Sequence, residues 1–462
     1  ELQSSGGSAI CHQEIGSWRA YSWQSMELFD SSSDEDDAGA ACAFDVHYLP
    51  IYNQISQLLA LKSPETLEDL EKSEQGGEMW ELGRAITCFQ DREFEKCASI
   101  CGVIGGQAWG MLERYKTWPE ACFRELFIYA KLMEAYCCMG KELWKDAVAA
   151  ADYAFIAGAP KNITNLVFRL VDPLVGVAPV KDPIIVPEIK GELPSFEVLS
   201  PYARLKQVEE RTDPSMKELE GLCTDGKPYL LRKCHEEWPA LKEWKDLRFF
   251  KSKYGHRVVP VEIGSSLGSM TEKAILFGEF VDRYLKPACE TYSGFDSGQG
   301  EIAYLAQHKL FDQLPELRRY AFAPHFCSHN GVEFAQSSVW FGTDRTETLL
   351  HFDSYSNFLV QVAGYKYVVL FPAGETDKLY VQGDKDGNVQ EKTYRAQGNT
   401  SPIDIRNPDL EKYPLFQEIE GFATVLGPGD TLYMPKGMWH YVRSLTPSLS
   451  VNFWFDMSKR CW

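Results

Sequence analysis

The stretch that decides the fold is "ETLLHFDSYSNFLVQVAGYKYVVLF", residues 347–371. It consists of short runs of β-branched and aromatic residues around a glycine turn, which predicts strands. His351 and Asp353 are separated by one residue within it. Because side chains alternate along a strand, both would point to the same face.

A second histidine, His440, lies in the strand-like segment "PGDTLYMPKGMWHYV", residues 428–442. Two imidazoles and one carboxylate arranged in this way are typical of a facial Fe(II) site that leaves positions open for a co-substrate and oxygen. We therefore predict that His351, Asp353 and His440 hold a metal ion used in oxidative chemistry. The alternative is a structural role without a metal.

Two further triplets, His12–Glu14 and His235–Glu237, have the related spacing H-x-E. Both lie in polar sequence without flanking strand runs. We interpret them as surface residues that bind nothing.

The composition indicates a globular protein of two or three domains, at roughly 150 residues per domain. The chain has 462 residues, of which 44% are hydrophobic and 13% aromatic. Its formal net charge of −19 disfavours direct binding to nucleic acid or to an anionic membrane. The same charge is compatible with a basic protein substrate, although it is equally explained by solubility.

The 13 cysteines form no C-x-x-C pair and no zinc-finger spacing, which favours a reducing compartment. We find no signal peptide and no apolar run of about 18 residues. The expected location is nuclear and/or cytoplasmic, neither secreted nor in a membrane.

The composition and the spacing of apolar residues change along the chain. Residues 1–45 are rich in Ser, Gly and acidic residues, and we expect a flexible segment. Residues 46–170 carry apolar residues at helical spacing and predict an all-α domain. Residues 171–200 contain several prolines and predict an extended linker. Residues 201–462 predict a β-rich domain, with a long polar loop at 381–405.

The predicted fold class is α+β. The β-rich runs, which include "RVVPVEIG", "NFLVQVAG" and "LSVNFWF", are separated by Gly, Pro and Asp turns and predict an antiparallel barrel or jelly roll. Helical insertions are expected at residues 238–255 and 279–292.

Three polar residues near the expected metal ligands could bind a carboxylate. Lys366 begins a strand directly after the turn at Gly364, so it can point into the barrel, where a buried lysine needs an acidic partner. A surface lysine is the alternative. Asn357 has the same strand parity as the two ligands before it, and Thr348 has the opposite parity.

The stretch from about 190 to 460 resembles the JmjC family of Fe(II)- and 2-oxoglutarate-dependent oxygenases. The resemblance rests on H-x-D with the asparagine and lysine after it, on "PGDTLYMPKGMWHYV" and on "SVNFWF". "VPVEIGS", "YLAQHKLFDQLPEL", "VWFG" and "NPDLEKYP" are similar to the JmjC-domain-containing protein 5 branch. The helical region, which ends in "AGAPKNITNLVFRLV", also resembles that branch.

The resemblance implies a cupin-type double-stranded β-helix with helical insertions, preceded by the all-α domain. It implies that His351, Asp353 and His440 bind Fe(II), and that oxygen is consumed. It further implies that 2-oxoglutarate is bound by four residues: Tyr304, Thr348, Asn357 and Lys366. Position 348 is usually serine in this branch, so threonine keeps the hydroxyl and adds a methyl group to the pocket.

The resemblance to this branch also implies hydroxylation of arginyl carbons in a basic protein or peptide. Glu262 could pair with a guanidinium, Trp340 could stack on it, and Gln307 could line the same pocket. A rim salt bridge for Glu262 and a core role for Trp340 are the alternatives.

Two other functions compete with arginyl hydroxylation. A methyl-lysine demethylase acting on chromatin would use the same iron site, although no zinc-binding reader signature is present. A non-catalytic JmjC scaffold would be marked by loss of a ligand or of the lysine, and this chain retains them all. No arrangement supporting proteolysis is found.

Overall fold

The computed structural model describes residues 43–60, 76–114, 121–177, 179–189, 195, 202–264, 270–294, 300–329, 331–381 and 398–457. The chain divides into the compact units Glu1–Val46 and His47–Trp462, and nearly all of the described residues belong to the second. Most of the acidic segment predicted at 1–45, most of the polar loop predicted at 381–405 and the triplet His12–Glu14 lie outside the described residues. Residues 43–45 begin a helix, contrary to the flexible segment predicted there.

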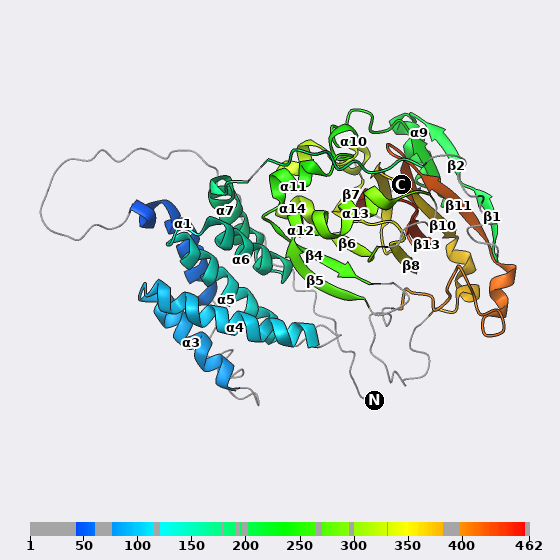
Figure 1. Ribbon diagram of the computed structural model, residues 1–462. Coiled ribbons are helices and arrows are strands. Elements are labelled where there is room, and N and C mark those ends of the chain that lie inside the picture. Colours follow the sequence, from blue (N-terminus) through cyan, green and yellow to red (C-terminus); the bar gives the residue numbers. More distant parts are fainter. Residues whose placement is uncertain are drawn as a thin grey trace, which may run out of the picture. The chain divides into compact units, whose positions relative to one another are not determined.

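The described residues of the stretch predicted to be helical, 46–170, form helices joined by short turns (Figure 1). Neighbours along the chain pack on one another, most extensively α4 with α5 and α5 with α6. The helices are α1 (Ala43–Ala60), α3 (Gly76–Gln90), α4 (Phe94–Arg114), α5 (Ala121–Met139), α6 (Trp144–Ile156) and α7 (Lys161–Val171), followed by the turn η1 (Asp172–Leu174). Helix α7 illustrates why this region folds into packed helices. Ile163, Val167 and Val171 recur every fourth residue, so they lie on one face, and all three are buried.

The β-rich region forms two sheets. The strands are β1 (Arg204–Gln207), β2 (Glu209–Thr212), β3 (Tyr229–Arg232), β4 (Val258–Ile263), β5 (Thr271–Leu276), β6 (Ala303–His308), β7 (Glu333–Gly342), β8 (Glu347–Phe352), β9 (Ser356–Ala363), β10 (Lys366–Phe371), β11 (Glu420–Leu426), β12 (Thr431–Met434), β13 (Trp439–Ser444) and β14 (Ser448–Asp456). One sheet has the order β1-β11-β10-β13-β8, and the other has the order β2-β3-β12-β9-β14-β7-β6-β4-β5. The predicted α+β fold with a C-terminal double-stranded β-helix is confirmed.

Strand β10 illustrates how alternation builds the barrel. Val368 and Leu370 belong to an apolar cluster shared by both sheets, which fills the space between them. Tyr367, Val369 and Phe371 point the other way and pack under the turns η5 (Ala373–Leu379) and η6 (Pro414–Glu418). Every residue of this strand is buried, as expected for a strand covered on both faces.

Helical insertions cover the outer face of the larger sheet. They are α9 (Met216–Leu222), α10 (Ala240–Glu243), α11 (Arg248–Tyr254), α12 (Phe277–Glu279), the π-helical turn η2 (Phe280–Leu285), α13 (Lys286–Thr291), α14 (Leu310–Gln313), η3 (Pro315–Arg319) and η4 (His325–Ser328). Phe250 packs against Phe277 and Phe341 at centroid distances of 5.4 Å in both cases, which fixes α11 and α12 on β7. Both insertions predicted from the sequence are helical.

A sharp turn joins β9 to β10. Gly364 has a φ of +71°, and a Cβ at this position would lie 2.1 Å from the carbonyl oxygen of Pro447. Only glycine fits both the conformation and the space. The turn therefore sets the start of β10, and with it the direction of Lys366.

The prediction that His235–Glu237 lies at the surface is wrong for His235. His235 is 5% exposed and its ring stacks on Trp238 with centroids 4.4 Å apart, whereas Glu237 is exposed. Nine of the cysteines within the described ranges are free thiols. No helix of these ranges is long and apolar enough to cross a membrane.

Candidate active site

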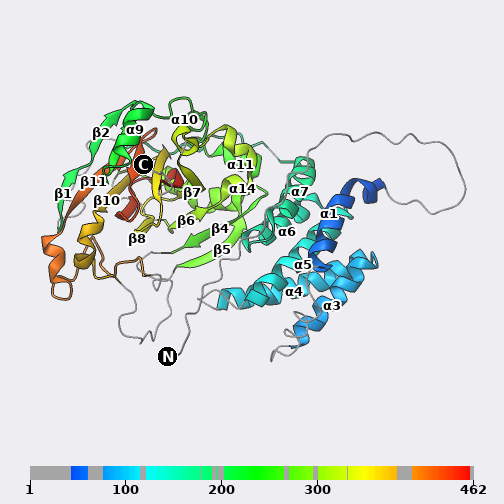
Figure 2. The same ribbon diagram turned by 180° about the vertical axis from the view of Figure 1, so that it is seen from behind.

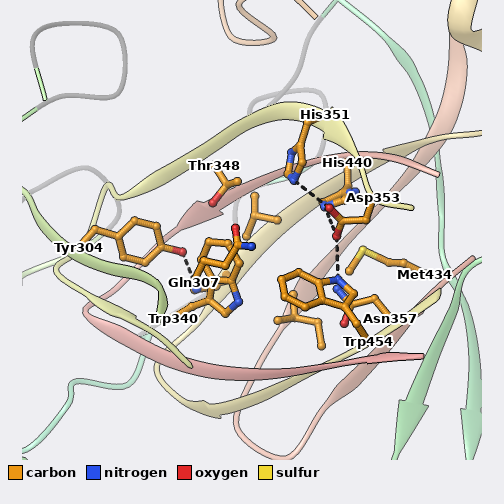
Figure 3. A pocket seen from close by; sticks show the side chains of 13 residues that line it. Tyr304, Gln307, Trp340, Thr348, His351, Asp353, Asn357, Met434, His440 and Trp454 are labelled. Atoms are coloured by element: carbon orange, nitrogen blue, oxygen red, sulfur yellow. Dashed lines mark hydrogen bonds and ion pairs between the residues drawn. The ribbon is translucent and has the colours of Figure 1, made fainter. Parts of the chain in front are cut away.

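The three predicted metal ligands meet at one end of the smaller sheet (Figure 3). His351 in β8 lies directly opposite His440 in β13, and their ring centroids are 4.2 Å apart. Asp353 follows β8, and its carboxylate oxygens lie 3.7 Å from Nε2 of His351 and 3.8 Å from Nε2 of His440. Among the residues that the structure describes, this is the only group of three such side chains whose ligand atoms lie within 4.8 Å of one another.

Backbone contacts orient both imidazoles for metal binding. The Nδ1 atom of His351 lies 2.8 Å from the carbonyl oxygen of Leu349, and Nδ1 of His440 lies 3.0 Å from that of Met438. A carbonyl can only accept, so Nδ1 carries the proton and Nε2 offers its lone pair to the centre. Burial and the neighbouring His440 lower the pKa of His351 to about 4, which keeps this ring neutral near neutral pH.

Trp454 in β14 orients the carboxylate. Its Nε1 donates a hydrogen bond of 2.9 Å to Oδ2 of Asp353. This bond leaves Oδ1, which lies 3.7 Å from Nε2 of His351, free to bind a metal ion. Sequence reasoning did not assign a role to Trp454, although it lies in the "SVNFWF" motif. Its parity with the inward-facing Asn452 was the available signal.

The prediction that Thr348 has the opposite parity is wrong, because β8 contains a bulge. Strand β8 pairs Thr348 with Val442 and His351 with His440, so it has one residue more than β13 between these pairs. The extra residue turns Thr348 to the same side as His351. Both side chains consequently line one cavity.

Strand β6 has a bulge of the same kind. Tyr304 pairs with Gly342 and His308 pairs with Val339, which again leaves one extra residue in the strand. Gln307 has a φ of +50° within the bulge, a conformation that is uncommon for residues other than glycine. The irregularity brings Tyr304 and Gln307, three residues apart, into the same cavity.

The three metal ligands line one cavity. Its other lining residues are Tyr304, Gln307, Trp340, Thr348, Asn357, Leu359, Lys366, Met434, Val442 and Trp454. The structure thus brings together every predicted site residue except Glu262, which does not line the cavity and lies on β4 opposite Tyr304. Leu359, Met434 and Val442 are apolar lining residues that the sequence did not single out.

Lys366 and Asn357 are buried polar residues: the first lacks a counter-charge and the second lacks a hydrogen-bond partner for its side-chain oxygen. Lys366 is 1% exposed, and its ammonium donates a hydrogen bond of 3.4 Å to the hydroxyl of Tyr304. No carboxylate of the described residues pairs with it, and burial lowers its pKa to about 7. The buried Oδ1 of Asn357 has no hydrogen-bond partner. The ammonium of Lys366 requires an acidic ligand, and a carboxylate of 2-oxoglutarate has the right charge. The oxygen of Asn357 requires a hydrogen-bond donor instead.

Trp340 and Glu262 border the same region. Nε1 of Trp340 donates to Oδ1 of Asn452 at 3.0 Å, and its ring lies 5.9 Å from that of Tyr304. Burial, together with the neighbouring carboxylate of Glu272, raises the pKa of Glu262 to about 7. No basic residue within the described parts of the chain pairs with Glu262, so a cation from outside could do so.

Comparisons with known proteins agree with this site. A family model described as "Cupin-like domain" matches residues 215–461. The chain is 29% identical over 469 residues to JmjC domain-containing protein F of Dictyostelium discoideum, which covers 88% of this chain and 98% of that protein. It is 34% identical to Jumonji C domain-containing protein 5 of Drosophila melanogaster and to Lysine-specific demethylase JMJ30 of Arabidopsis thaliana. These two alignments cover 57% and 59% of this chain, and 63% and 62% of the relatives, respectively.

This chain therefore belongs to the cupin-like JmjC family of Fe(II)- and 2-oxoglutarate-dependent oxygenases, with relatives that include the JmjC-domain-containing protein 5 branch. The alignments span less than two thirds of the length of the fly and plant relatives. The family predicted from the sequence is confirmed.

Proposed function

We propose that this chain hydroxylates a carbon atom of arginyl side chains in proteins or peptides. The observation that carries the proposal is the composition of the cavity beside the metal ligands. It offers a flat aromatic ring, Trp340, and an amide, Gln307, and the unpaired carboxylate of Glu262 lies on the adjoining strand. A guanidinium stacks on aromatic rings and pairs with carboxylates, so this combination suits arginine.

The residues divide the work between two sides of the cavity. His351, Asp353 and His440 would hold Fe(II), while Lys366, Asn357, Tyr304 and Thr348 would hold 2-oxoglutarate. When bound, iron with 2-oxoglutarate and oxygen supplies the oxidation: one oxygen atom replaces C–H by C–OH, and the other leaves in succinate as carbon dioxide is lost. The apolar walls exclude water, and Trp340 holds the reacting side chain in place.

Demethylation of methyl-lysine is the second candidate, favoured by the name of the relative Lysine-specific demethylase JMJ30. The same site would hydroxylate an N-methyl carbon, after which formaldehyde leaves. Nothing in the metal centre separates the two reactions. The non-catalytic scaffold is disfavoured, because the ligands and Lys366 share one cavity.

The test is succinate formation by the full chain with Fe(II), ascorbate and 2-oxoglutarate, in the presence of arginyl or methyl-lysyl peptides. His351→Ala provides the blank. We expect an arginyl peptide to stimulate succinate formation and to gain the mass of one oxygen atom. Loss of a methyl group with formaldehyde would assign demethylation instead, and no stimulation by any peptide would contradict both.

Glu262→Gln tests the arginine assignment more directly. We expect it to raise KM for the arginyl peptide by about tenfold, the effect of losing one charge-assisted hydrogen bond. The matched control is Glu237→Gln, which removes an exposed carboxylate outside the cavity. Equal KM values for the two variants would contradict the role of Glu262.

The charge of the chain bears on its partner. A formal net charge of −19 supports a basic substrate protein, in the nucleus or the cytoplasm, over nucleic acid. If so, KM for a basic peptide rises as salt is added, because screening weakens long-range attraction. A KM independent of salt would contradict this part of the proposal.

A further inference from the structure

A buried ion pair joins the helical region to the barrel. Asp152 in α6 is 0% exposed, and Arg257, just before β4, is 1% exposed. Nη2 of Arg257 donates to Oδ1 of Asp152 at 2.7 Å, and its Nε donates to Oδ2 at 2.9 Å. Helix α6 lies beside β4 and β5 in both views (Figure 1 and Figure 2).

The same carboxylate holds two further groups of the barrel. It accepts a hydrogen bond of 2.9 Å from the backbone amide of Val258, the first residue of β4. It also accepts one of 2.6 Å from Nε2 of Gln313 in α14. A carboxylate is costly to bury without hydrogen-bond donors, and Arg257, Val258 and Gln313 supply them here.

Gln313 extends the connection to the bulge of β6. Its Nε2 donates to the carbonyl oxygen of Val258 at 2.8 Å, and its Oε1 lies 2.6 Å from Nε2 of His308, which donates to it. His308 is the last residue of β6 and directly follows Gln307. One carboxylate in a helix thus fixes the start of β4 and the end of β6.

We propose that Asp152 is a positioning residue for the substrate side of the cavity. Strand β4 carries Glu262, and β6 carries Gln307, two of the residues proposed above to contact the arginyl substrate. The metal ligands come from β8, β13 and the residue after β8, in the other sheet. Asp152 accordingly sets the geometry of the substrate side without touching the metal side. The part of this inference that concerns substrate rests on the arginyl hydroxylation proposed above.

The helical region has other attachments, so loss of the carboxylate does not release it. Lys161 of α7 forms an exposed ion pair with Asp312 of α14, and the hydroxyl of Tyr153 lies 3.4 Å from the carbonyl oxygen of Ala274 in β5. Buried ion pairs are poor sources of net stability, since apolar residues of the same volume often do as well. What the pair supplies here is a fixed geometry for two strands.

The experiment measures hydrogen exchange of backbone amides in the full chain. The variants are Asp152→Asn, which removes the charge, and Gln313→Leu, which breaks the connection to β6 while Arg257 keeps its carboxylate. The matched control is Lys161→Ala, which removes an exposed ion pair from the same interface. Cobalt(II) binding reports on the metal side, and KM for an arginyl peptide reports on the substrate side.

We expect both variants to accelerate exchange in β6 by about tenfold or more, the effect of losing a hydrogen bond to a charged group. Asp152→Asn should also accelerate amide exchange in β4 by about tenfold or more. Exchange in β8 and β13, cobalt affinity and the Lys161→Ala control should match the parent protein. Peptide KM should rise by about five- to tenfold with a smaller change in kcat.

Unchanged exchange in β4 and β6 would overturn the inference. Equal acceleration in all barrel strands would also overturn it, because Asp152 would then act on global stability alone. If no peptide is turned over, the proposed function fails, yet the exchange measurement still decides whether Asp152 positions these strands.

Discussion

Replacing Lys366 with methionine should make the metal-free protein more stable while abolishing its use of 2-oxoglutarate. The side chain is 1% exposed and has no acidic partner among the described residues. Burial without a counter-charge destabilises the protonated form, so the folded protein carries a cost that only a bound acid removes. Methionine has nearly the same length and no charge.

The magnitude derives from the pKa of Lys366, which burial lowers from 10.5 to about 7. At about 1.4 kcal/mol per pH unit, the protonated form costs the folded state about 5 kcal/mol at pH 7 and below. Above this pH the folded state gives up its proton while the unfolded chain keeps it up to about pH 10.5, so the cost shrinks as the pH rises. Loss of the contact with Tyr304 and imperfect packing offset part of the gain, leaving a net of about 2–3 kcal/mol at pH 7.

The assay is urea unfolding of the metal-free full chain between about pH 7 and pH 9, with 2-oxoglutarate binding measured separately. We expect Lys366→Met to raise the free energy of unfolding most at pH 7 and to weaken 2-oxoglutarate binding at least tenfold. Lys206→Met, on a side chain that is 73% exposed, is the control and should change stability by less than about 0.5 kcal/mol. A Lys366→Met variant less stable than the parent at pH 7, or a difference independent of pH, would refute the reasoning.

The contacts and burial of three other side chains, Trp454, Glu262 and His235, lead to further predictions. Trp454→Phe removes the hydrogen bond to Asp353 and should weaken cobalt(II) binding by about tenfold in calorimetry, and unchanged affinity would show that the bond does not orient the carboxylate. Because the pKa of Glu262 is raised to about 7 and a guanidinium needs the ionised carboxylate, KM for an arginyl peptide should fall as the pH rises from about 6 to about 8. Glu262→Gln should flatten that profile, and a slope that persists in the variant would exclude Glu262 as its source. Burial lowers the pKa of His235 to about 4, so protonation of the unfolded chain should reduce the free energy of unfolding between pH 6.5 and 4 by up to about 3 kcal/mol. His235→Phe should remove that part of the acid sensitivity in urea unfolding, and an identical pH slope would count against it.

The sequence pattern predicts the direction of a side chain correctly where the residue lies in a regular strand. Alternation and the glycine turn were enough to direct Lys366 into the barrel, and the H-x-D spacing was enough to put two ligands on one face. Thr348 and Gln307 escaped this reasoning, because each depends on a bulge. One extra residue in a strand reverses its parity, and nothing in the letters around either position marks it.

Contacts between distant segments were also beyond the sequence. Trp454 and Asp353 are 101 residues apart, and Asp152 and Arg257 are 105 residues apart. An aspartate in an amphipathic helix ordinarily faces water, so only the docking of α6 on β4 explains its burial. His235 was misjudged for a similar reason, since its polar neighbours concealed the stacking on Trp238.

The place of β14 in the larger sheet has a consequence for synthesis on the ribosome. This strand lies between β7 and β9, which precede it by about 100 residues in the chain. At roughly 5–20 residues per second, β7 and β9 wait on the order of 10 s for the strand that joins them. During that time both present unpaired, largely apolar edges, which invite association between nascent chains. The barrel closes only when its central strand emerges, and yield should therefore depend on chaperones that shield the growing chain until then.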